Sequence, residues 1–225
     1  MRPATLTPMR RAIGRRMSAS KQQAPHFYVS AELVLDPALA HVEELKRAAP
    51  QARVSLTAVL VRASVVALKA HPALNAVWAG EELMLAQEAN VGVAIALDDG
   101  LIAPAIFERD ATDVVCTARA LDDLVARARS GRLRGAEATG ATFTLSNLGM
   151  FAVTSFIAIV TPPQVAILGA GTVTRAPRFV DGGLVERALM TVTVSADHRA
   201  VDGADVARFL QTFKTTIEEL EGVDG

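Results

Sequence analysis

The chain has 225 residues, a length typical of one large domain rather than of two domains of ordinary size. Apolar residues make up 51% of the chain and charged residues 21%, with a mean hydropathy of +0.29, which excludes a disordered chain and leaves ample material for a buried core. The net charge of −1 at pH 7 excludes a general electrostatic attraction to nucleic acid or to anionic membranes.

The N-terminal segment is predicted to be a linker remnant followed by a helix and a strand. We expect residues 1–7 to be the linker remnant. Thr7 then offers a helix cap and Pro8 suits the first helical position, so a helix is predicted to run to about Lys21. Apolar residues alternate over residues 27–35, which predicts a half-buried strand.

Two further helices are expected before the middle of the chain. Asp36-Pro37 predicts a helix start of the same kind as Thr7-Pro8. Residues 56–70 are apolar on nearly every side, which predicts a buried helix. His71-Pro72 is expected to end this helix, because the residue before a proline avoids the helical region.

The second half is predicted to mix hairpins, short strands and helices. Asp98-Asp99-Gly100 indicates a hairpin between strands over 91–97 and 101–106, and Thr112 is the expected cap of a long amphipathic helix. The remaining expected elements are a loop at 131–140, strands at 142–146, 165–170 and 191–195, a hairpin at 181–183, and a helix at 204–221. This order favours an α+β sandwich over a doubly wound sheet.

Three features of the sequence bear on location. It contains no uninterrupted apolar run of about 18 residues, the length that would span a membrane. The N-terminus lacks the apolar stretch of a signal peptide, and the single cysteine, Cys116, cannot form an internal disulfide. We therefore expect a cytoplasmic protein with neither a membrane nor a nucleic acid as partner.

The segment with the clearest chemical pattern is Ser195-Ala196-Asp197-His198-Arg199-Ala200-Val201-Asp202-Gly203. A predicted strand leads a histidine into a turn that ends in Asp-Gly before a helix. A histidine titrates near neutral pH, so His198 can accept a proton and return it within one catalytic cycle. The alternative is a histidine with no role beyond a strand-to-helix turn.

This segment resembles the active-site signature of the dihydrolipoamide acyltransferases, the E2 components of 2-oxoacid dehydrogenase complexes, which is shared with chloramphenicol acetyltransferase. Other segments resemble the same family in the same order, from about residue 6 to the last helix. They are Met9-Arg10-Arg11-Ala12-Ile13-Gly14-Arg15-Arg16-Met17, Asn90-Val91-Gly92-Val93, Gly100-Leu101-Ile102, Thr144-Leu145-Ser146-Asn147-Leu148-Gly149-Met150-Phe151 and Thr161-Pro162-Pro163-Gln164-Val165-Ala166-Ile167-Leu168-Gly169.

The resemblance implies a chloramphenicol acetyltransferase-like α/β sandwich that works as a homotrimer, with active sites between subunits. Residues 8–225 would form the acyltransferase catalytic domain, and nothing resembles a lipoyl domain or a peripheral-subunit-binding domain. Relatives usually end in an apolar run that docks into the next trimer, whereas this chain ends in an acidic segment, 218–225. Burying acidic groups in an apolar socket is costly, so we expect an isolated trimer or a weak higher assembly.

The family chemistry assigns roles to His198 and Ser146. The histidine would take the proton from the thiol of coenzyme A, and the thiolate would attack an acyl thioester carried on a lipoyl group. A free thiol has a pKa of about 8.5, so an adjacent base makes the attack efficient at neutral pH. Ser146 matches the family serine that donates a hydrogen bond to the oxyanion from a neighbouring subunit, and its alternative role is a hydroxyl within a turn.

Asp202 resembles the family aspartate that orients the active-site turn through an ion pair with an arginine, and it also suits the cap of the last helix. The sequence departs from the family here, because no arginine stands at the matching place in the helix after the first strand. Arg47, Arg53 and Arg199 are the possible substitutes, and the alternative is that this ion pair is missing and that contacts with coenzyme A are weakened. A second departure is Ala96, where relatives commonly have an aspartate near the coenzyme A channel.

Three residues are candidates for coenzyme A binding. Ser55 matches a family serine near the cofactor and equally suits the cap of the helix over 56–70. Gly169 and Gly171 either let the backbone approach the cofactor or form bends in a strand.

Cys116 has no evident base partner and is expected to serve packing. The histidines lack a metal-ligand spacing, so we predict no metal.

The function implied by the resemblance is transfer of an acyl group between dihydrolipoamide and coenzyme A. Acetyl is favoured over branched-chain acyl and succinyl groups. The expected partners are a lipoyl domain as acyl donor and the decarboxylase and dihydrolipoamide dehydrogenase components of the complex. The alternatives are a structural core homologue that has lost activity and a stand-alone acetyltransferase acting on a small hydroxyl acceptor.

Overall fold

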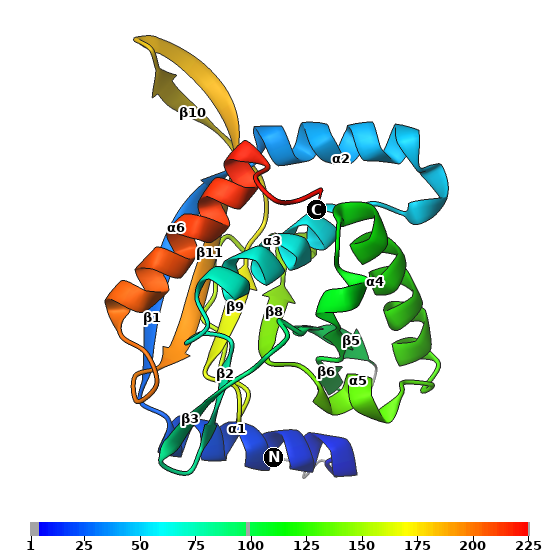
Figure 1. The fold of residues 1–225 in the computed structure, drawn as a ribbon, viewed down its shortest axis with the longest axis vertical. Coiled ribbons are helices and arrows are strands. Elements are labelled where there is room, and N and C mark those ends of the chain that lie inside the picture. Colours follow the sequence, from blue (N-terminus) through cyan, green and yellow to red (C-terminus); the bar gives the residue numbers. More distant parts are fainter. Residues whose placement is uncertain (1–4, 98–99, 225) are drawn as a thin grey trace.

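A mixed seven-stranded sheet runs through the computed structural model, which describes residues 5–97 and 100–224. Its strands are β1 (His26–Val34), β4 (Val91–Val93), β7 (Ala105–Ile106), β8 (Phe143–Asn147), β9 (Ala166–Ala170), β10 (Thr174–Val180) and β11 (Gly183–Asp197). The order is β1-β11-β9-β8-β4-β7, and β10 pairs with the first half of β11 as a ribbon that projects from the body (Figure 1). Two smaller strand pairs are β2 (Ala76–Ala79) with β3 (Glu82–Leu85) and β5 (Ile95–Leu97) with β6 (Gly100–Ile102).

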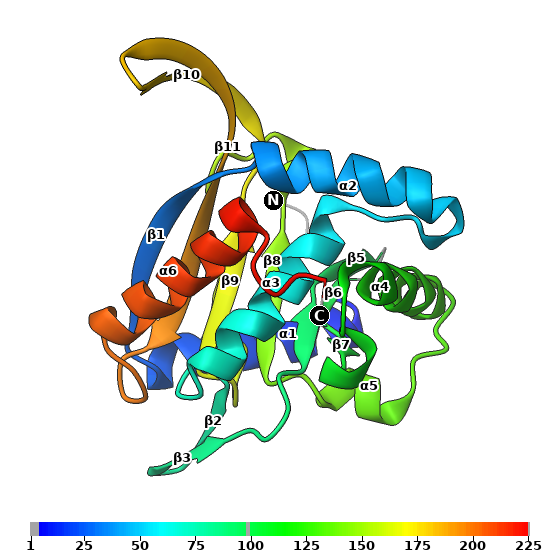
Figure 2. The same ribbon diagram turned by 45° about the horizontal axis from the view of Figure 1, so that its top comes forward.

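Helices cover one face of this sheet and lie at its ends. The α-helices are α1 (Pro8–Gln23), α2 (Asp36–Ala48), α3 (Leu56–Ala70), α4 (Val114–Arg129), α5 (Gly135–Thr139) and α6 (Gly203–Glu219), and single 3₁₀ turns span Pro50–Ala52, Glu108–Asp110 and Gly149–Phe151. Helices α3 and α6 pack side by side on one face of the sheet, and α2 lies near the base of the β10–β11 ribbon (Figure 2). None of the helices in the described part of the chain combines the length and the apolar character needed to cross a bilayer.

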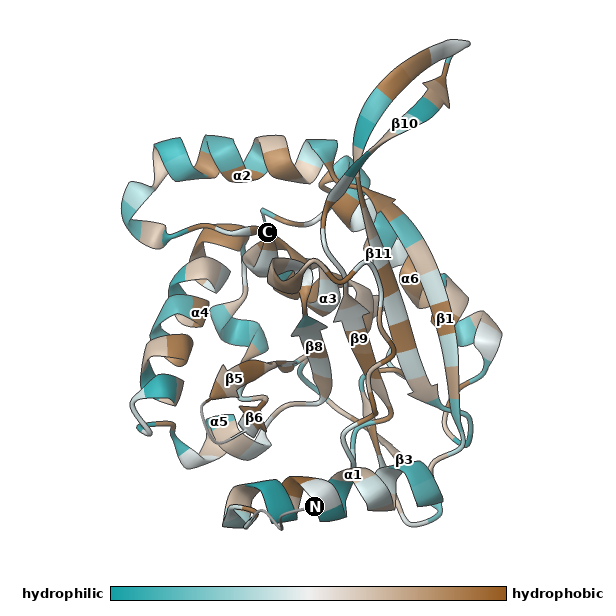
Figure 3. Ribbon diagram, turned by 180° about the vertical axis from the view of Figure 1, so that it is seen from behind, coloured by the Kyte–Doolittle hydropathy of each residue, from teal (hydrophilic) through white to brown (hydrophobic). Residues whose placement is uncertain are grey.

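The core lies between the sheet and the two packed helices. Along β11, Val192, Val194 and Ala196 are fully buried in this core, so the alternate residues of the strand face the other side of the sheet. Phe209 and Phe213 of α6 are also fully buried. The hydropathy colouring shows apolar residues gathered on α3 and the central strands and polar residues spread over α2 and α4 (Figure 3). The predicted α+β sandwich is therefore confirmed.

The C-terminal turn folds back onto this core. Val223 is fully buried, although it lies in the segment that the sequence marks as acidic. The Arg62 side chain donates to the carbonyl oxygen of Gly222 at 2.6 Å, and His41 lies 3.0 Å from a carboxylate oxygen of Asp224. One apolar residue thus anchors the acidic end within its own chain.

Helix starts are only partly as the sequence predicts. The Thr7 hydroxyl accepts a hydrogen bond from the backbone N–H of Arg10, as expected of a cap. Asp36 differs, because it lies inside α2 and its carboxylate accepts from the N–H of Ala188 in β11 instead of from its own helix. The prediction that Thr112 caps α4 is wrong: the cap is Asp113, whose carboxylate accepts from the N–H of Cys116 at 2.7 Å.

Two other predictions are corrected in the middle of the chain. The segment 131–140, expected as a loop, contains α5. The strands expected over 91–97 and 101–106 are each divided in two. The parts far from the turn, β4 and β7, pair with each other in the main sheet, where β4 also pairs with β8, whereas the parts nearest the turn, β5 and β6, pair only with each other. The expected hairpin is supported by the register of Leu97 with Gly100, and Asp98 and Asp99 lie outside the described residues.

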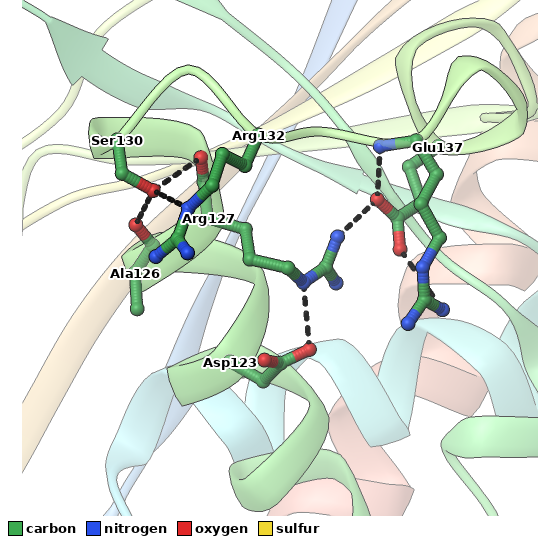
Figure 4. Close-up of polar contacts among 7 residues, drawn as sticks. Asp123, Ala126, Arg127, Ser130, Arg132 and Glu137 are labelled. Carbon is green, nitrogen blue, oxygen red and sulfur yellow. Dashed lines mark hydrogen bonds and ion pairs between the residues drawn. The ribbon is translucent and has the colours of Figure 1, made fainter.

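A short helix is held in place by a buried ion pair. The Glu137 carboxylate, whose side chain is 5% exposed, accepts hydrogen bonds from the Arg127 guanidinium and from the backbone N–H of Arg134 (Figure 4). Arg127 also donates to Asp123 at 2.9 Å. The Arg127 hydrogen bond holds the pKa of Glu137 below its usual range, because it stabilises the ionised carboxylate. A cavity of about 390 Å³, whose lining includes Cys116, lies beside this pair.

The cap of α4 can be tested with neighbouring substitutions. Asp113→Ala should lower the free energy of unfolding by about 1 kcal/mol, because it leaves helix N–H groups without an acceptor. Thr112→Ala should leave it unchanged within about 0.5 kcal/mol, as expected for a surface position. Urea unfolding followed by circular dichroism measures both, and a larger loss for Thr112→Ala than for Asp113→Ala would contradict the assignment.

Candidate active site

The tight turn after β11 presents His198 at the surface. The N–H of Ala200 donates to the carbonyl of Asp197 at 3.0 Å, which closes the turn around His198 and Arg199. The His198 N–H donates to the carbonyl of Pro25 at 2.9 Å, and the His198 ring lies 4.5 Å from the Phe27 ring, centroid to centroid. The backbone of the histidine is thus tied to the neighbouring strand while its side chain stays exposed.

The other three histidines are engaged in structural contacts. One ring nitrogen of His26 lies 2.8 Å from the carbonyl of Ala24, and the other accepts from the N–H of Val160. His71 lies 2.8 Å from the Thr212 hydroxyl, and His41 is paired with the C-terminal turn. Among residues 5–97 and 100–224, no hydrogen bond to a ring nitrogen of His198 is found, so the structure leaves this imidazole available for proton transfer.

The carboxylate before His198 and the guanidinium after it form an ion pair. The Asp197 side chain is 3% exposed. One of its oxygens accepts from the N–H and the Nε–H of Arg199, both at 3.0 Å, and the other accepts from Nη2 at 2.6 Å. These hydrogen bonds raise the pKa of Arg199, because they stabilise the charged guanidinium. This pair was missed from the sequence, although its signal, an aspartate and an arginine on either side of the histidine, was present.

Asp202 is the cap of α6. Its carboxylate accepts from the N–H groups of Ala204 at 2.8 Å and Asp205 at 3.0 Å, and its own N–H donates to the Asp205 carboxylate. This reciprocal arrangement is a capping box and confirms the cap interpretation of Asp202. It also holds the pKa of Asp205 below its usual range, chiefly through the N–H of Asp202.

Asp202 has no arginine partner in the described part of the chain. Arg199 binds Asp197, and Arg53 pairs with Asp122 at 3.1 Å. The Nε–H of Arg47 donates to the carbonyl of its helix neighbour Glu43. Of the two alternatives that the sequence left open, a substitute arginine and a missing brace, the described residues agree with the second, since none of these three arginines pairs with Asp202.

Ser146 lies near the carboxyl end of β8 and is partly exposed. It stands opposite Gly169 of β9, which stands opposite Thr193 of β11. His198 lies five residues beyond Thr193, which is roughly 16 Å along the strand at about 3.3 Å per residue. Across the sheet, Ser146 is also two strands away from β11, with about 4.8 Å between neighbouring strands. A single chain therefore does not bring Ser146 and His198 together.

The three candidate coenzyme A residues have structural partners of their own. Ser55 is the cap of α3, and its hydroxyl accepts from the N–H of Ala58 at 3.4 Å. A Cβ on Gly169 would lie 3.0 Å from the Phe156 ring, and one on Gly171 would lie 2.0 Å from the carbonyl oxygen of Thr154. Gly171 is therefore required by the close approach of the Thr154 backbone, and a side chain at Gly169 would have to displace the Phe156 ring by a few tenths of an ångström.

No group of three histidine, cysteine, aspartate or glutamate side chains within the described residues is arranged to hold a metal ion. The turn after β11 offers the exposed imidazole of His198 and the Asp197–Arg199 ion pair beside it.

Comparison with known proteins places this geometry in a family. The family described as 2-oxoacid dehydrogenases acyltransferase (catalytic domain) matches residues 2–223. The chain belongs to this acyltransferase family. The dihydrolipoyllysine-residue acetyltransferase component of the pyruvate dehydrogenase complex of Zymomonas mobilis is 36% identical over 220 residues, which cover 97% of this chain and 50% of that relative. The chain thus spans about half the length of the curated relatives that it matches.

Solved structures confirm the predicted fold. The dihydrolipoamide acetyltransferase (E2p) of Azotobacter vinelandii matches with a TM-score of 0.93 and 26% identity, over 99% of this chain and 93% of that one. A chloramphenicol acetyltransferase matches with a TM-score of 0.58 and 14% identity, over 90% and 94% of the two chains, and this likeness concerns the fold alone. The chloramphenicol acetyltransferase-like α/β fold is therefore that of the family.

The cap function of Asp202 predicts a difference between two substitutions. Asp202→Ala should lower the free energy of unfolding by about 1 kcal/mol, whereas Asp202→Asn should leave it nearly unchanged, because asparagine caps helices about as well as aspartate. Thermal and urea unfolding of both variants provide the measurement. Equal destabilisation by the two substitutions would show that the negative charge, and not the cap, is what α6 requires.

Proposed function

We propose that this chain transfers an acyl group, with acetyl as the favoured group, between dihydrolipoamide and coenzyme A as part of a 2-oxoacid dehydrogenase complex. One observation carries the proposal. In the Azotobacter vinelandii acetyltransferase, a serine, a histidine and an asparagine were investigated for their role in catalysis, with the serine 52 positions before the histidine and the asparagine four after it. Ser146, His198 and Asp202 have the same spacing.

The chemistry follows from the free imidazole of His198. It takes the proton of the coenzyme A thiol, and the thiolate sulfur forms a bond to the carbonyl carbon of the lipoyl thioester. The tetrahedral intermediate carries its negative charge on the former carbonyl oxygen, to which the Ser146 hydroxyl donates. The bond from carbon to the lipoyl sulfur then breaks, and the imidazolium returns the proton to that sulfur. Coenzyme A and the acyl-lipoyl group are both substrates of this reaction, and the proposed steps use no resident cofactor.

The separation of Ser146 from His198 supports an active site between subunits of a homotrimer. The segment after Ser146 exposes large apolar side chains, with Met150 70%, Phe151 63% and Ile157 58% accessible in the single chain. Such an apolar surface is typical of a protein interface. A second copy of the chain that covers it would bring the His198 turn of one subunit to Ser146 of the next.

The remaining assignments are proposals of the same kind. Ser55 is proposed to contact coenzyme A through hydroxyl capacity that the 3.4 Å cap bond leaves unused. Gly169 and Gly171 are proposed to shape the site through the segment 153–156 packed against them.

A lipoyl domain would present the acyl group, and the decarboxylase and dihydrolipoamide dehydrogenase components would act before and after this step. Residues 8–225 form the proposed catalytic unit, acting in the cytoplasm.

A structural core homologue without activity is the second candidate. The observation that favours it is the lack of an arginine paired with Asp202 in the described part of the chain, together with Ala96 in place of the aspartate common in relatives. The presence of Ser146, His198 and Asp202 at the spacing of the residues investigated in the Azotobacter vinelandii acetyltransferase counts against it.

Substitution of the two proposed catalytic residues tests the function directly. His198→Ala should abolish acyl transfer between acetyl-dihydrolipoamide and coenzyme A, because the thiol then has no base. Ser146→Ala should lower the rate by about 10²–10³, the cost of one oxyanion donor. Steady-state assays of the purified chain measure both, with His41→Ala, at a histidine paired with Asp224, as a control. Wild-type activity no higher than that of His198→Ala would overturn the enzyme proposal in favour of the structural core.

A further inference from the structure

The turn that carries His198 has few contacts that fix the direction of the imidazole. Its backbone is held by the Ala200 N–H to the Asp197 carbonyl and by the His198 N–H to Pro25. The ring itself touches Phe27 and is otherwise exposed. Proton transfer needs the base within hydrogen-bond reach of the thiol, so something beyond these contacts must fix the orientation of the turn.

Asp197 and Arg199 supply further contacts at the same turn. The Asp197 carboxylate is buried, and every hydrogen bond that it accepts within the described residues comes from Arg199. A buried carboxylate without a partner is strongly unfavourable, so this pair stays together while the protein is folded. Because Arg199 binds through its backbone N–H as well as its guanidinium, the pair fixes the backbone on the carboxyl side of His198.

The outer side of the Arg199 guanidinium is also in contact. It lies over the indole of Trp78, 4.9 Å from the ring centroid. The backbone N–H of Trp78 donates to the carbonyl of Pro163 at 2.8 Å, which ties β2 to the segment that leads into β9. Arg199 therefore connects the end of the main sheet to the separate β2–β3 pair, and the His198 turn is held from two directions.

We propose that Asp197 and Arg199 are positioning residues that hold the His198 turn in its reactive orientation, with Trp78 as the outer support. This inference rests on the proposed function. It assigns to Asp197 and Arg199 the orienting role that the sequence suggested for Asp202, whose carboxylate is occupied by the N-terminus of α6. Neither residue is required to touch the reacting atoms.

Arg199→Lys and Asp197→Asn are the informative variants. Lysine keeps the charge but not the planar fork that binds both carboxylate oxygens, and asparagine keeps the shape but not the charge. Each variant should lower the kcat of acyl transfer by about 10- to 100-fold, the effect of a displacement of roughly 1 Å. The KM values for coenzyme A and dihydrolipoamide should stay within about two-fold, because substrate binding is not changed.

Arg127→Lys is the matched control. Arg127 also binds a buried carboxylate, that of Glu137, but the pair lies between α4 and α5, on the side of the molecule away from the end of β11 (Figure 1, Figure 4). The Arg127→Lys substitution should lower the thermal unfolding temperature about as much as Arg199→Lys does, but it should leave kcat unchanged. The control thus separates positioning from general destabilisation.

A second readout does not depend on activity. The chain has four histidines, so the ring signals of isotope-labelled histidine can be assigned by comparison with His198→Ala. Since the His198 ring lies against Phe27, its chemical shift reports the orientation of the imidazole. Arg199→Lys and Asp197→Asn should move the His198 signals and leave those of His26, His41 and His71 in place.

Three results would decide against the proposal. The first is an unchanged kcat with unmoved His198 signals in both folded variants. The second is a raised KM for coenzyme A with unchanged kcat, which would make Arg199 a substrate-binding residue. The third is an equal loss of kcat in Arg127→Lys. An inactive wild-type chain would instead refute the proposed function, and the histidine spectra would still show whether Asp197 and Arg199 orient His198.

Discussion

The long strand β11 is the constraint on which the site depends. Its 15 residues pair with β1 along one edge and with β10 and then β9 along the other, and it ends at the turn that carries His198. Val192, Val194 and Ala196 of its second half lie in the apolar core and alternate with Thr193, Ser195 and Asp197, so a shift by one residue would place these polar side chains in that core. The same register places Thr193, not His198, level with Ser146 across the sheet. A stable sheet therefore separates the two proposed catalytic residues within one chain.

Asp202 and Asp197, the two acidic residues that flank the His198 turn, have different structural roles. Asp202 satisfies the N–H groups at the start of α6, and Asp197 is buried against Arg199. Both contacts stabilise the backbone around His198 and leave its ring nitrogens free, whereas the other histidines are bound into the fold. An imidazole that accepts and returns a proton needs this combination of a fixed backbone and an unengaged ring.

Local signals in the sequence predicted much of this fold, and contacts distant in sequence account for most of the errors. The Thr7 cap and the end of α3 at His71 depend on neighbouring residues alone, and both are as expected. Asp36 suited a helix cap locally, but its carboxylate binds Ala188, 152 positions away. The resemblance to a family identified His198, whereas the Asp197–Arg199 pair that flanks it was missed, because the burial of Asp197 follows from the position of β11 in the sheet.

The central claim is that His198 of one subunit works with Ser146 of another, and mixing two inactive variants tests it most directly. Each variant alone lacks one half of every site. When His198→Ala and Ser146→Ala chains are unfolded together and reassembled in equal amounts, random mixing should restore about one quarter of the wild-type acyl transfer, because each site draws its two residues from different chains of a closed ring. Activity that stays at the mean of the two separate variants, with mixed trimers demonstrated, would contradict the account.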